Sequence, residues 1–413
     1  MNYWFALDEE TFISTVEDKG LLYNSATYKY LKFNHTGKIK ACIDQFLDLE
    51  NLYCIKINQN DLKDAELNKF VKAVVLKKMG LCTPVSVEAS KPIALAPILN
   101  LQKDIERSES LDYHYTGQGI VNNLLEITLF VNGECNQHCP KCLYMYKQIP
   151  FCTKSKKAIN YDKLCSFLDK IPSGYLDKIN ICGGNIFEYE MIHQLFEKLD
   201  RSKSEKTVFC SYLNVSQEQP LLKWFLSELF HLQILVYFPV VDQDQLIECF
   251  NLNQQNQYYL SYLFVVTSLS EYEASISFVE KYQLSQYEIK PYYNGKNMEF
   301  FRDNIFITEN DIFQSRLNKR QVFAIQKLNT NFFGKLTIFS EQNVYANINH
   351  PAIGALDDSI YELLFKEMTQ GISWRNTRYQ AIPCKDCIYK LLCPSLSNYE
   401  IAIGQSNLCH LKP

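Results

Sequence analysis

Three cysteines within eight residues are the part of this sequence with the clearest capacity for chemistry. Cys135, Cys139 and Cys142 have the spacing C-x3-C-x2-C and follow directly after the apolar run Leu124–Val131. Thiolates this close together in a loop can converge on one metal centre, as iron–sulfur ligation requires. Three ligands on a four-iron cluster leave one iron free to bind another molecule.

A second group of cysteines lies near the C-terminus. Cys384, Cys387, Cys393 and Cys409 have the spacing C-x2-C-x5-C-x15-C, and four thiolates are enough to fill a metal site. Both an iron–sulfur cluster and a four-cysteine zinc site use such a set. Three cysteines within ten residues of a charged, proline-containing loop rarely arise from packing, so we expect a bound metal.

Zinc is also an alternative for the first group, because Cys152 or His138 could act as the fourth ligand of a closed site. The other cysteines lie singly in apolar or helical contexts, where a free thiol behaves as a small buried hydrophobic group. The total of 15 cysteines is odd, which argues against a disulfide framework. The cysteines expected to serve packing are Cys42, Cys54, Cys82, Cys165, Cys182, Cys210 and Cys249.

Length and composition predict a soluble protein of two or three domains. The chain has 413 residues, of which 47% are hydrophobic and 21% charged, and its net charge of −4 gives no reason to expect a nucleic-acid partner. Asp8, Glu9 and Glu10 are unlike the basic start of a signal peptide. Apolar runs such as Tyr258–Val266 are strand-sized and too short for a membrane span. We therefore expect a cytoplasmic location.

Between residues 124 and 300, six strand-like runs alternate with helical patterns, which indicates a parallel sheet that is open or curled into a partial barrel. In such folds the chemistry lies at the carboxyl ends of the strands. The first cysteine group follows the first strand there, and Gly183-Gly184 follows the second. The expected strands are Leu124–Val131, Lys178–Cys182, Thr207–Tyr212, Gln233–Phe238, Tyr258–Val266 and Gln286–Pro291, with helices near 161–170, 188–200, 216–230, 243–251 and 270–282.

The segments on either side of residues 124–300 do not show this regular alternation of strands and helices. Residues 1–80 predict a small α+β or winged-helix-like module that ends in a helix over about Asp61–Lys78, with Gly80 placed to stop it. Residues 81–123 predict a linker with one possible strand at Ile93–Leu101. Residues 124–300 form the expected βα domain. Residues 301–413 form a last domain that contains a hairpin (Lys335–Phe339 with Gln342–Ile348), a helix near Ser359–Met368 and the second cysteine group.

With these motifs the chain resembles the radical S-adenosylmethionine (SAM) enzymes that carry a C-terminal SPASM domain, a group that modifies ribosomally made peptides. The resemblance covers roughly residues 124–413 and implies a partial (β/α)6 barrel of the radical SAM type followed by a SPASM-like iron–sulfur domain. It implies that Cys135, Cys139 and Cys142 bind a [4Fe–4S] cluster whose open iron binds SAM. Reduction would then cleave SAM to a 5′-deoxyadenosyl radical that abstracts a hydrogen from the substrate.

The resemblance also implies the remaining site residues. Gly183, Gly184 and Asn185 stand where the family has the SAM-binding sequence Gly-Gly-Glu-Pro. One auxiliary [4Fe–4S] cluster is implied at the second cysteine group, in which Cys409 is the distant last ligand. The residues of that group are Cys384, Cys387, Cys393 and Cys409.

Four positions depart from the family pattern. Lys141 stands where an aromatic residue usually precedes the third cysteine, and Asn185 replaces a glutamate whose carboxylate could pair with the SAM ammonium. Ala346 and Ser397 stand at two positions where SPASM domains often have a cysteine. We therefore expect the first auxiliary cluster of such domains to be absent and the second to be complete.

A subgroup shares the sequence around Gly183-Gly184-Asn185 and Cys393-Pro394-Ser395: the pseudo-radical-SAM proteins of the Gly-Gly Bacteroidales peptide-modification system. This resemblance implies a precursor peptide with a leader, and a companion radical SAM enzyme. The N-terminal module is similar to domains that bind a leader by adding it to a sheet edge. The sequence leaves three alternative functions, in order of preference: a peptide-modifying radical SAM enzyme, a non-catalytic partner that binds precursor for a companion enzyme, and a zinc-binding scaffold.

Overall fold

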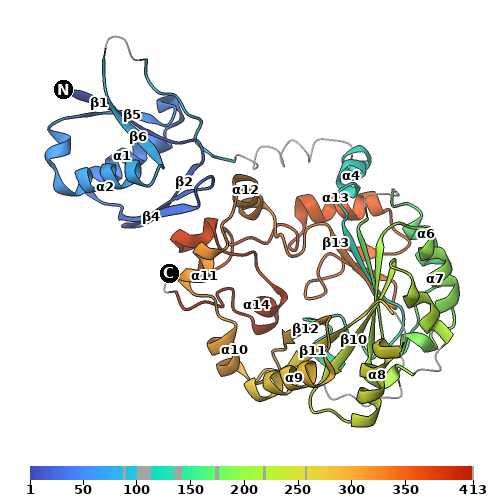
Figure 1. Ribbon diagram of the computed structural model, residues 1–413. Coiled ribbons are helices and arrows are strands. Elements are labelled where there is room, and N and C mark those ends of the chain that lie inside the picture. Colours follow the sequence, from blue (N-terminus) through green and yellow to red (C-terminus); the bar gives the residue numbers. More distant parts are fainter. Residues whose placement is uncertain are drawn as a thin grey trace.

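The computed structural model describes residues 1–86, 90–99, 113–133, 135, 142–172, 176–216, 220–255 and 258–411. These residues form one nine-stranded sheet and two three-stranded sheets. The large sheet and its helices make up one body, and the two small sheets belong to a separate N-terminal module (Figure 1). None of the helices in the described part combines the length and the hydrophobicity needed to cross a bilayer.

The nine-stranded sheet contains all six strands that the sequence predicts, and they run parallel in chain order. Every residue of the strand β11 is buried, as is typical of a parallel strand covered on both faces. The sheet is an open one with β12 (Tyr287–Pro291) and β15 (Gly354–Ala355) as its end strands. The six strands are β7 (Glu126–Phe130), β8 (Lys178–Cys182), β9 (Glu205–Ser211), β10 (Phe230–Tyr237), β11 (Leu260–Val266) and β12 (Tyr287–Pro291).

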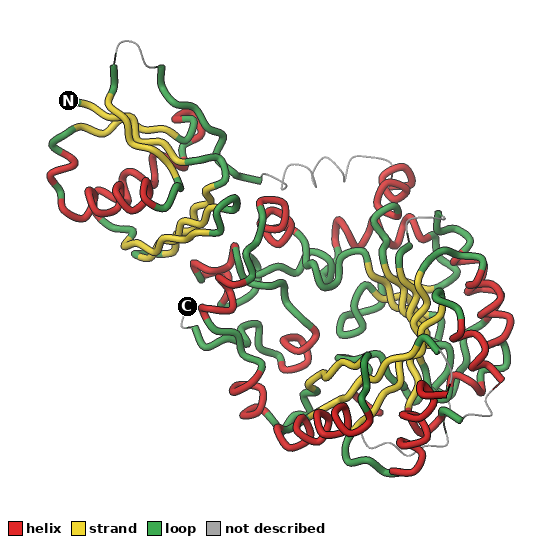
Figure 2. Tube along the Cα trace, in the orientation of Figure 1, coloured by secondary structure: helices red, strands yellow, loops and turns green. Residues whose placement is uncertain are grey.

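Helices cover one side of this sheet, and the C-terminal segment lies on the other side (Figures 1 and 2). In place of the helix expected over 216–230, the chain forms a shorter 3-10 helix, η5 (Pro220–Leu226). The expected range extends too far, because Phe230 already pairs with β9 as the first residue of the next strand. The other four expected helices are present as α6 (Tyr161–Leu168), α7 (Ile192–Asp200), α8 (Gln243–Gln255) and α9 (Leu269–Tyr282).

The predicted C-terminal hairpin is confirmed and extends the same sheet. Its first strand, β13 (Lys335–Ile338), pairs parallel with β7 and antiparallel with β14 (Asn343–Tyr345). Such a pairing joins residues about 200 positions apart, which local sequence patterns do not reveal. The remaining elements are β15 (Gly354–Ala355), α5 (Cys142–Met145), α10 (Met298–Asn304), α11 (Glu309–Gln314), α12 (Lys319–Lys327), α13 (Ile360–Gln370), α14 (Asn398–Ile403), η3 (Ile186–Glu188), η4 (Tyr212–Asn214), η6 (Cys384–Asp386) and η7 (Ile388–Leu391).

The segment predicted as a linker contains regular structure at both of its ends. The strand β6 (Gly80–Pro84) pairs with β1, and a Cβ on Gly80 would lie 2.3 Å from the Ala6 carbonyl oxygen, so Gly80 permits this close pairing. The helix α4 (Tyr113–Val121) packs on α13, and a Cβ on Gly117 would lie 2.4 Å from the Tyr361 carbonyl oxygen. Residues 93–99 of the possible strand form no regular element, and residues 100 and 101 lie outside the described residues.

The N-terminal module contains two antiparallel sheets, with strand orders β5-β1-β6 and β2-β3-β4. The last predicted helix begins at Ala65 after the cap Asp64, whose side chain accepts a hydrogen bond from the Leu67 N–H, and the residues before it form a 3-10 turn. The elements are β1 (Asn2–Leu7), β2 (Thr11–Val16), β3 (Lys19–Asn24), β4 (Lys29–Asn34), α1 (Gly37–Leu47), η1 (Leu49–Asn51), β5 (Cys54–Asn58), η2 (Asp61–Lys63) and α2 (Ala65–Leu76).

The sheet β2-β3-β4 attaches the module to the C-terminal part of the chain. The Tyr23 hydroxyl donates to the Leu317 carbonyl over 2.7 Å, and the Tyr30 ring stacks on Phe313. Lys32 forms a 2.6 Å ion pair with Glu309, which also accepts a hydrogen bond from the Tyr389 hydroxyl. Tyr389 lies between two cysteines of the C-terminal group, so the module is anchored beside that group.

A buried carboxyl on α13 gives stability a pH dependence that can be measured. Glu367 accepts hydrogen bonds from the Ser373 and Trp374 N–H groups at 2.9 and 2.8 Å. Burial raises its pKa, and the two donors oppose the rise. The folded protein therefore retains a proton that the unfolded chain releases, so this contribution to the unfolding free energy falls as pH rises from the ordinary glutamate pKa through the folded one.

We expect Glu367→Gln to remove that fall from the pH profile of urea unfolding followed by circular dichroism. The exposed residue Glu362 on the same helix supplies the control Glu362→Gln, which should keep the wild-type profile. A Glu367→Gln profile that parallels the wild type at every pH would contradict the assignment.

Candidate functional site

A small pocket lies where four neighbouring parallel strands end. Its wall includes Cys135, which follows β7, Gly183 and Gly184, which follow β8, Ser211 at the end of β9, and Leu235 in β10. Its volume is about 20 Å³, which holds roughly one water molecule, so a larger ligand requires the wall to move. The structure thus places Cys135 and the glycine pair together at the edge of the sheet where the sequence predicts chemistry.

The rest of the first cysteine group is only partly described. Cys142 is the first residue of α5, and its side chain lies outside the described part. Cys139, Lys141 and His138 also lie outside the described residues. The convergence of three thiolates at this pocket therefore stays a prediction from their spacing.

Sequence reasoning missed Asn132, which joins the ends of β7 and β8. This side chain is 4% exposed; its Oδ1 accepts from the Gly184 N–H at 3.1 Å and its Nδ2 donates to the Asn185 carbonyl at 2.8 Å. A Cβ on Gly183 would lie 2.5 Å from the Asn132 Oδ1. Gly183 is therefore required by this contact, whatever it does for a ligand. A polar residue directly after an apolar strand run was the available signal.

Gly183→Ala is expected to destabilise the protein by about 1–3 kcal/mol, because the added methyl group must push Asn132 away from the β8 end. The matched control is Gly119→Ala in α4, where a Cβ would meet nothing within 4 Å. That change should stabilise by about 0.5–1 kcal/mol, since alanine favours a helix more than glycine does. Urea unfolding measures both, and equal effects of the two variants would refute the close contact.

Asn185 has a structural task at the position where the family glutamate is expected. It is the N-cap residue of η3: its Oδ1 accepts from the Phe187 N–H at 3.3 Å, and its Nδ2 donates to the Glu188 carboxylate at 3.0 Å. A carboxylate is thus present three residues further along the chain, on an exposed side chain.

Cys152 lines the same pocket as Cys135. It is 5% exposed; its sulfur accepts a hydrogen bond from the Lys154 N–H at 3.3 Å and contacts the Gly133 carbonyl at 3.6 Å. Its neighbour Gly133 permits the loop to approach, because a Cβ there would lie 2.2 Å from the Ser155 nitrogen. The structure thus places Cys152, which the sequence offers as an alternative ligand of the first group, in the same pocket as Cys135.

The C-terminal cysteines come together from two segments of the chain. Cys384 begins η6, Cys387 precedes η7 and Cys393 follows it, while Cys409 arrives through a parallel bridge to Ile307. All four are half-buried. Burial raises the pKa of the Cys393 thiol to about 12, Arg378 opposes the rise, and the three other thiols add to it.

This donor set suits a thiolate-ligated group. Four cysteine side chains from one region provide the ligands that iron–sulfur clusters and structural zinc sites use. Within the part of the chain that the structure describes, no three Cys, His, Asp or Glu side chains form a group that could hold a single metal ion. The ligand type of these four cysteines, rather than a grouping around one ion, is what suits an iron–sulfur cluster.

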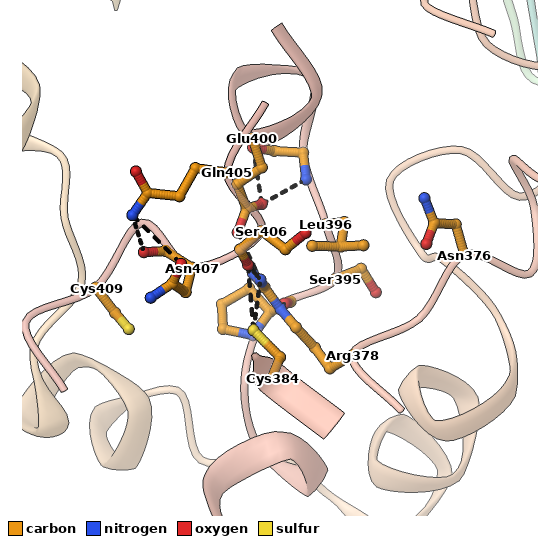
Figure 3. A network of polar contacts seen from close by, with 12 residues as sticks. Asn376, Arg378, Cys384, Ser395, Leu396, Glu400, Gln405, Ser406, Asn407 and Cys409 are labelled. Atoms are coloured by element: carbon orange, nitrogen blue, oxygen red, sulfur yellow. Dashed lines mark hydrogen bonds and ion pairs between the residues drawn. The ribbon is translucent and has the colours of Figure 1, made fainter. Parts of the chain in front are cut away.

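A buried arginine, which sequence reasoning missed, contacts Cys384 (Figure 3). Arg378 is 6% exposed, and its Nη1 lies 3.6 Å from the Cys384 sulfur and forms a 2.5 Å ion pair with Glu400. The same nitrogen donates to the Ser406 carbonyl, which also accepts from the Cys384 thiol at 3.2 Å. The Nε donates to the Pro394 carbonyl at 2.8 Å.

Ser397 and Ala346 stand at the two positions where the sequence resemblance predicts a cysteine in many SPASM domains. Ser397 caps α14, where its N–H and hydroxyl donate to the Glu400 Oε2 at 2.7 and 3.2 Å. Ser397 therefore holds the carboxylate that pairs with Arg378. Ala346 is buried directly after β14.

No protein-family model and no curated protein sequence matches the chain. Solved structures of Streptococcus suis SuiB match its fold. SuiB bound to S-adenosylmethionine aligns with a TM-score of 0.51 and 13% identity, covering 100% of this chain and 99% of SuiB. SuiB bound to the precursor peptide SuiA aligns with a TM-score of 0.51 and 11% identity, covering 98% of this chain and 100% of SuiB. The chain is thus similar to SuiB in fold over its whole length.

Proposed function

We propose that this protein is a radical SAM/SPASM-type iron–sulfur protein that acts in the maturation of a ribosomally synthesised peptide. One observation carries the proposal: Cys135 lies with Gly183 and Gly184 in one pocket, at the carboxyl ends of four parallel strands. The fold supports it, because SuiB, whose structures are bound to SAM and to a precursor peptide, aligns along the full chain.

In this proposal Cys135, Cys139 and Cys142 hold the [4Fe–4S] cluster, and SAM binds next to Gly183, Gly184 and Asn185. A reduced cluster of this type supplies the electron that cleaves SAM. The chain's own part is positioning, since Asn132 holds the Gly184 backbone against the end of β7. The wall of the pocket would have to move to admit SAM, because its present volume is about that of one water molecule.

The peptide partner is proposed to bind the N-terminal module. Its sheet β5-β1-β6 has the end strands β5 and β6, and an extended leader can add to such an edge through main-chain hydrogen bonds. The domain limits in this proposal are the N-terminal module over residues 1–80, the linker over 81–123, the partial barrel over 124–300 and the SPASM-like domain over 301–413. The described cysteines are all free thiols, which suits a reducing cytoplasm.

Anaerobic reconstitution of the full chain tests the proposal. We expect about eight irons and eight sulfides per chain, counting two four-iron clusters. With dithionite and SAM, 5′-deoxyadenosine should form. Zinc without sulfide would overturn the iron–sulfur assignment, and full clusters that never cleave SAM would assign the chain to the non-catalytic partner class.

A further inference from the structure

We propose that Arg378 is a positioning residue that raises the reduction potential of a [4Fe–4S] cluster held by the C-terminal cysteines, and that Glu400 limits this effect. The inference rests on the proposed function, because it requires iron and sulfide at Cys384, Cys387, Cys393 and Cys409.

The geometry directs a positive charge at one ligand. The Arg378 Nη1 lies 3.6 Å from the Cys384 sulfur, within reach of an N–H···S hydrogen bond, and the guanidinium is almost excluded from water. The Ser406 and Pro394 carbonyls accept from the same guanidinium and fix its orientation. Figure 3 shows Arg378, Cys384 and Ser406 meeting at one point.

The direction in which each side chain shifts the reduction potential follows from its charge. One-electron reduction makes a thiolate-ligated cluster more negative, so a nearby cation and N–H donors to sulfur stabilise the reduced form. Glu400 has the opposite effect, because its carboxylate lies 2.5 Å from the same guanidinium. Solvent screening is weak here, since both side chains are buried.

A role in stability alone does not explain the pair. A buried ion pair is a poor source of stability, because removing two charges from water offsets most of their attraction. Here the chain adds further groups to keep it: Ser397 orients Glu400 through two hydrogen bonds, and two backbone carbonyls orient Arg378. These contacts keep the Arg378 guanidinium, and not the Glu400 carboxylate, next to the Cys384 sulfur.

The test isolates the C-terminal cluster in the full chain. Cys135, Cys139 and Cys142 are all changed to alanine, the protein is reconstituted anaerobically, and the midpoint potential is measured by redox titration with EPR detection. Into this background are placed Arg378→Gln, Glu400→Gln, the double variant with both changes, and the conservative Arg378→Lys. The matched control is Arg375→Gln, a half-buried arginine nearby whose guanidinium donates to the Met368 carbonyl.

We expect Arg378→Gln to lower the potential and Glu400→Gln to raise it, each by about tenfold in the reduction equilibrium, or about 59 mV. Arg378→Lys should restore most of the loss, and the double variant should lie between the singles. Arg375→Gln should match the background protein. A merely structural role for the pair would not give shifts of opposite sign.

Two results overturn the inference in distinguishable ways. Four irons per chain with one common potential across the variants would refute the role of Arg378 and leave the cluster assignment standing. A background protein that binds no iron, or zinc alone, would refute the cluster itself and with it the proposed function of this domain. If Arg378→Gln fails to fold, two other comparisons still decide the question. Glu400→Gln should raise the midpoint potential above that of the background protein, and the double variant should have a lower potential than Glu400→Gln.

Discussion

Replacing Cys135 with alanine is expected to abolish reductive SAM cleavage and to remove half of the iron. Without Cys135 the first cluster keeps only two of its three proposed thiolates, whereas the C-terminal cysteines are untouched. Iron and sulfide should therefore fall from about eight to about four per chain. The measurements are iron and sulfide content, and 5′-deoxyadenosine released with dithionite and SAM.

Cys409→Ala is the reciprocal variant. It should also leave about four irons per chain, but SAM cleavage should persist, because the remaining cluster is the one proposed to bind SAM. Cys152→Ala tests whether Cys152 is a ligand of the first cluster or only lies beside it. Cys152 lines the same pocket as Cys135, but its sulfur accepts a hydrogen bond from the Lys154 N–H. We expect this variant to keep the wild-type iron content. A Cys135→Ala protein with all its iron would contradict the assignment of the first cluster.

Trp374→Ala is expected to destabilise the protein by about 3–5 kcal/mol, the usual cost of deleting a buried aromatic side chain. Trp374 is completely buried and packs edge-on against Phe333. Its indole N–H donates to the Lys335 carbonyl at 3.1 Å, and its backbone N–H donates to Glu367. The indole contacts connect the loop after α13 to the start of β13, so this loop should loosen from the central sheet. Urea unfolding followed by circular dichroism measures the loss.

Trp374→Phe divides that loss into its parts. The ring packing is largely kept, but the Lys335 carbonyl loses its indole donor, so we expect an effect smaller than that of alanine. Trp224→Phe is the control, because the buried Trp224 Nε1 has no hydrogen-bond partner among the described residues. If Trp374→Phe costs no more than Trp224→Phe, the indole hydrogen bond contributes nothing to stability.

Several features could be read from local sequence. The six parallel strands agree with predicted runs within a few residues, because β-branched and aromatic residues bounded by polar turns specify strands locally. The amphipathic stripe Ile192, Leu195, Phe196 and Leu199 likewise appears buried on α7. The glycine pair follows β8 and Cys135 follows β7, so their meeting at one sheet edge follows from parallel topology alone.

Other features depend on contacts between distant segments. The linker predicted over 81–123 contains the helix α4, in which Gly117 lets α13 approach. The attachment of β13 to β7, and of the β2-β3-β4 sheet to α11, joins residues about 200 to 280 positions apart. The local sequence pattern of these segments does not indicate which distant segment each one contacts.

Spacing and periodicity are local properties, so the sequence alone is enough to locate the two cysteine groups, the alternation of strands and helices, and the sheet edge at which Cys135 lies. What surrounds these cysteines depends on the tertiary structure. It placed Cys152 beside Cys135, packed Asn132 against Gly183, and paired Arg378 with Glu400 next to Cys384. The physical reason is that burial and charge compensation arise from the packing of segments far apart in the chain, and a buried charge finds its partner only when the fold is complete.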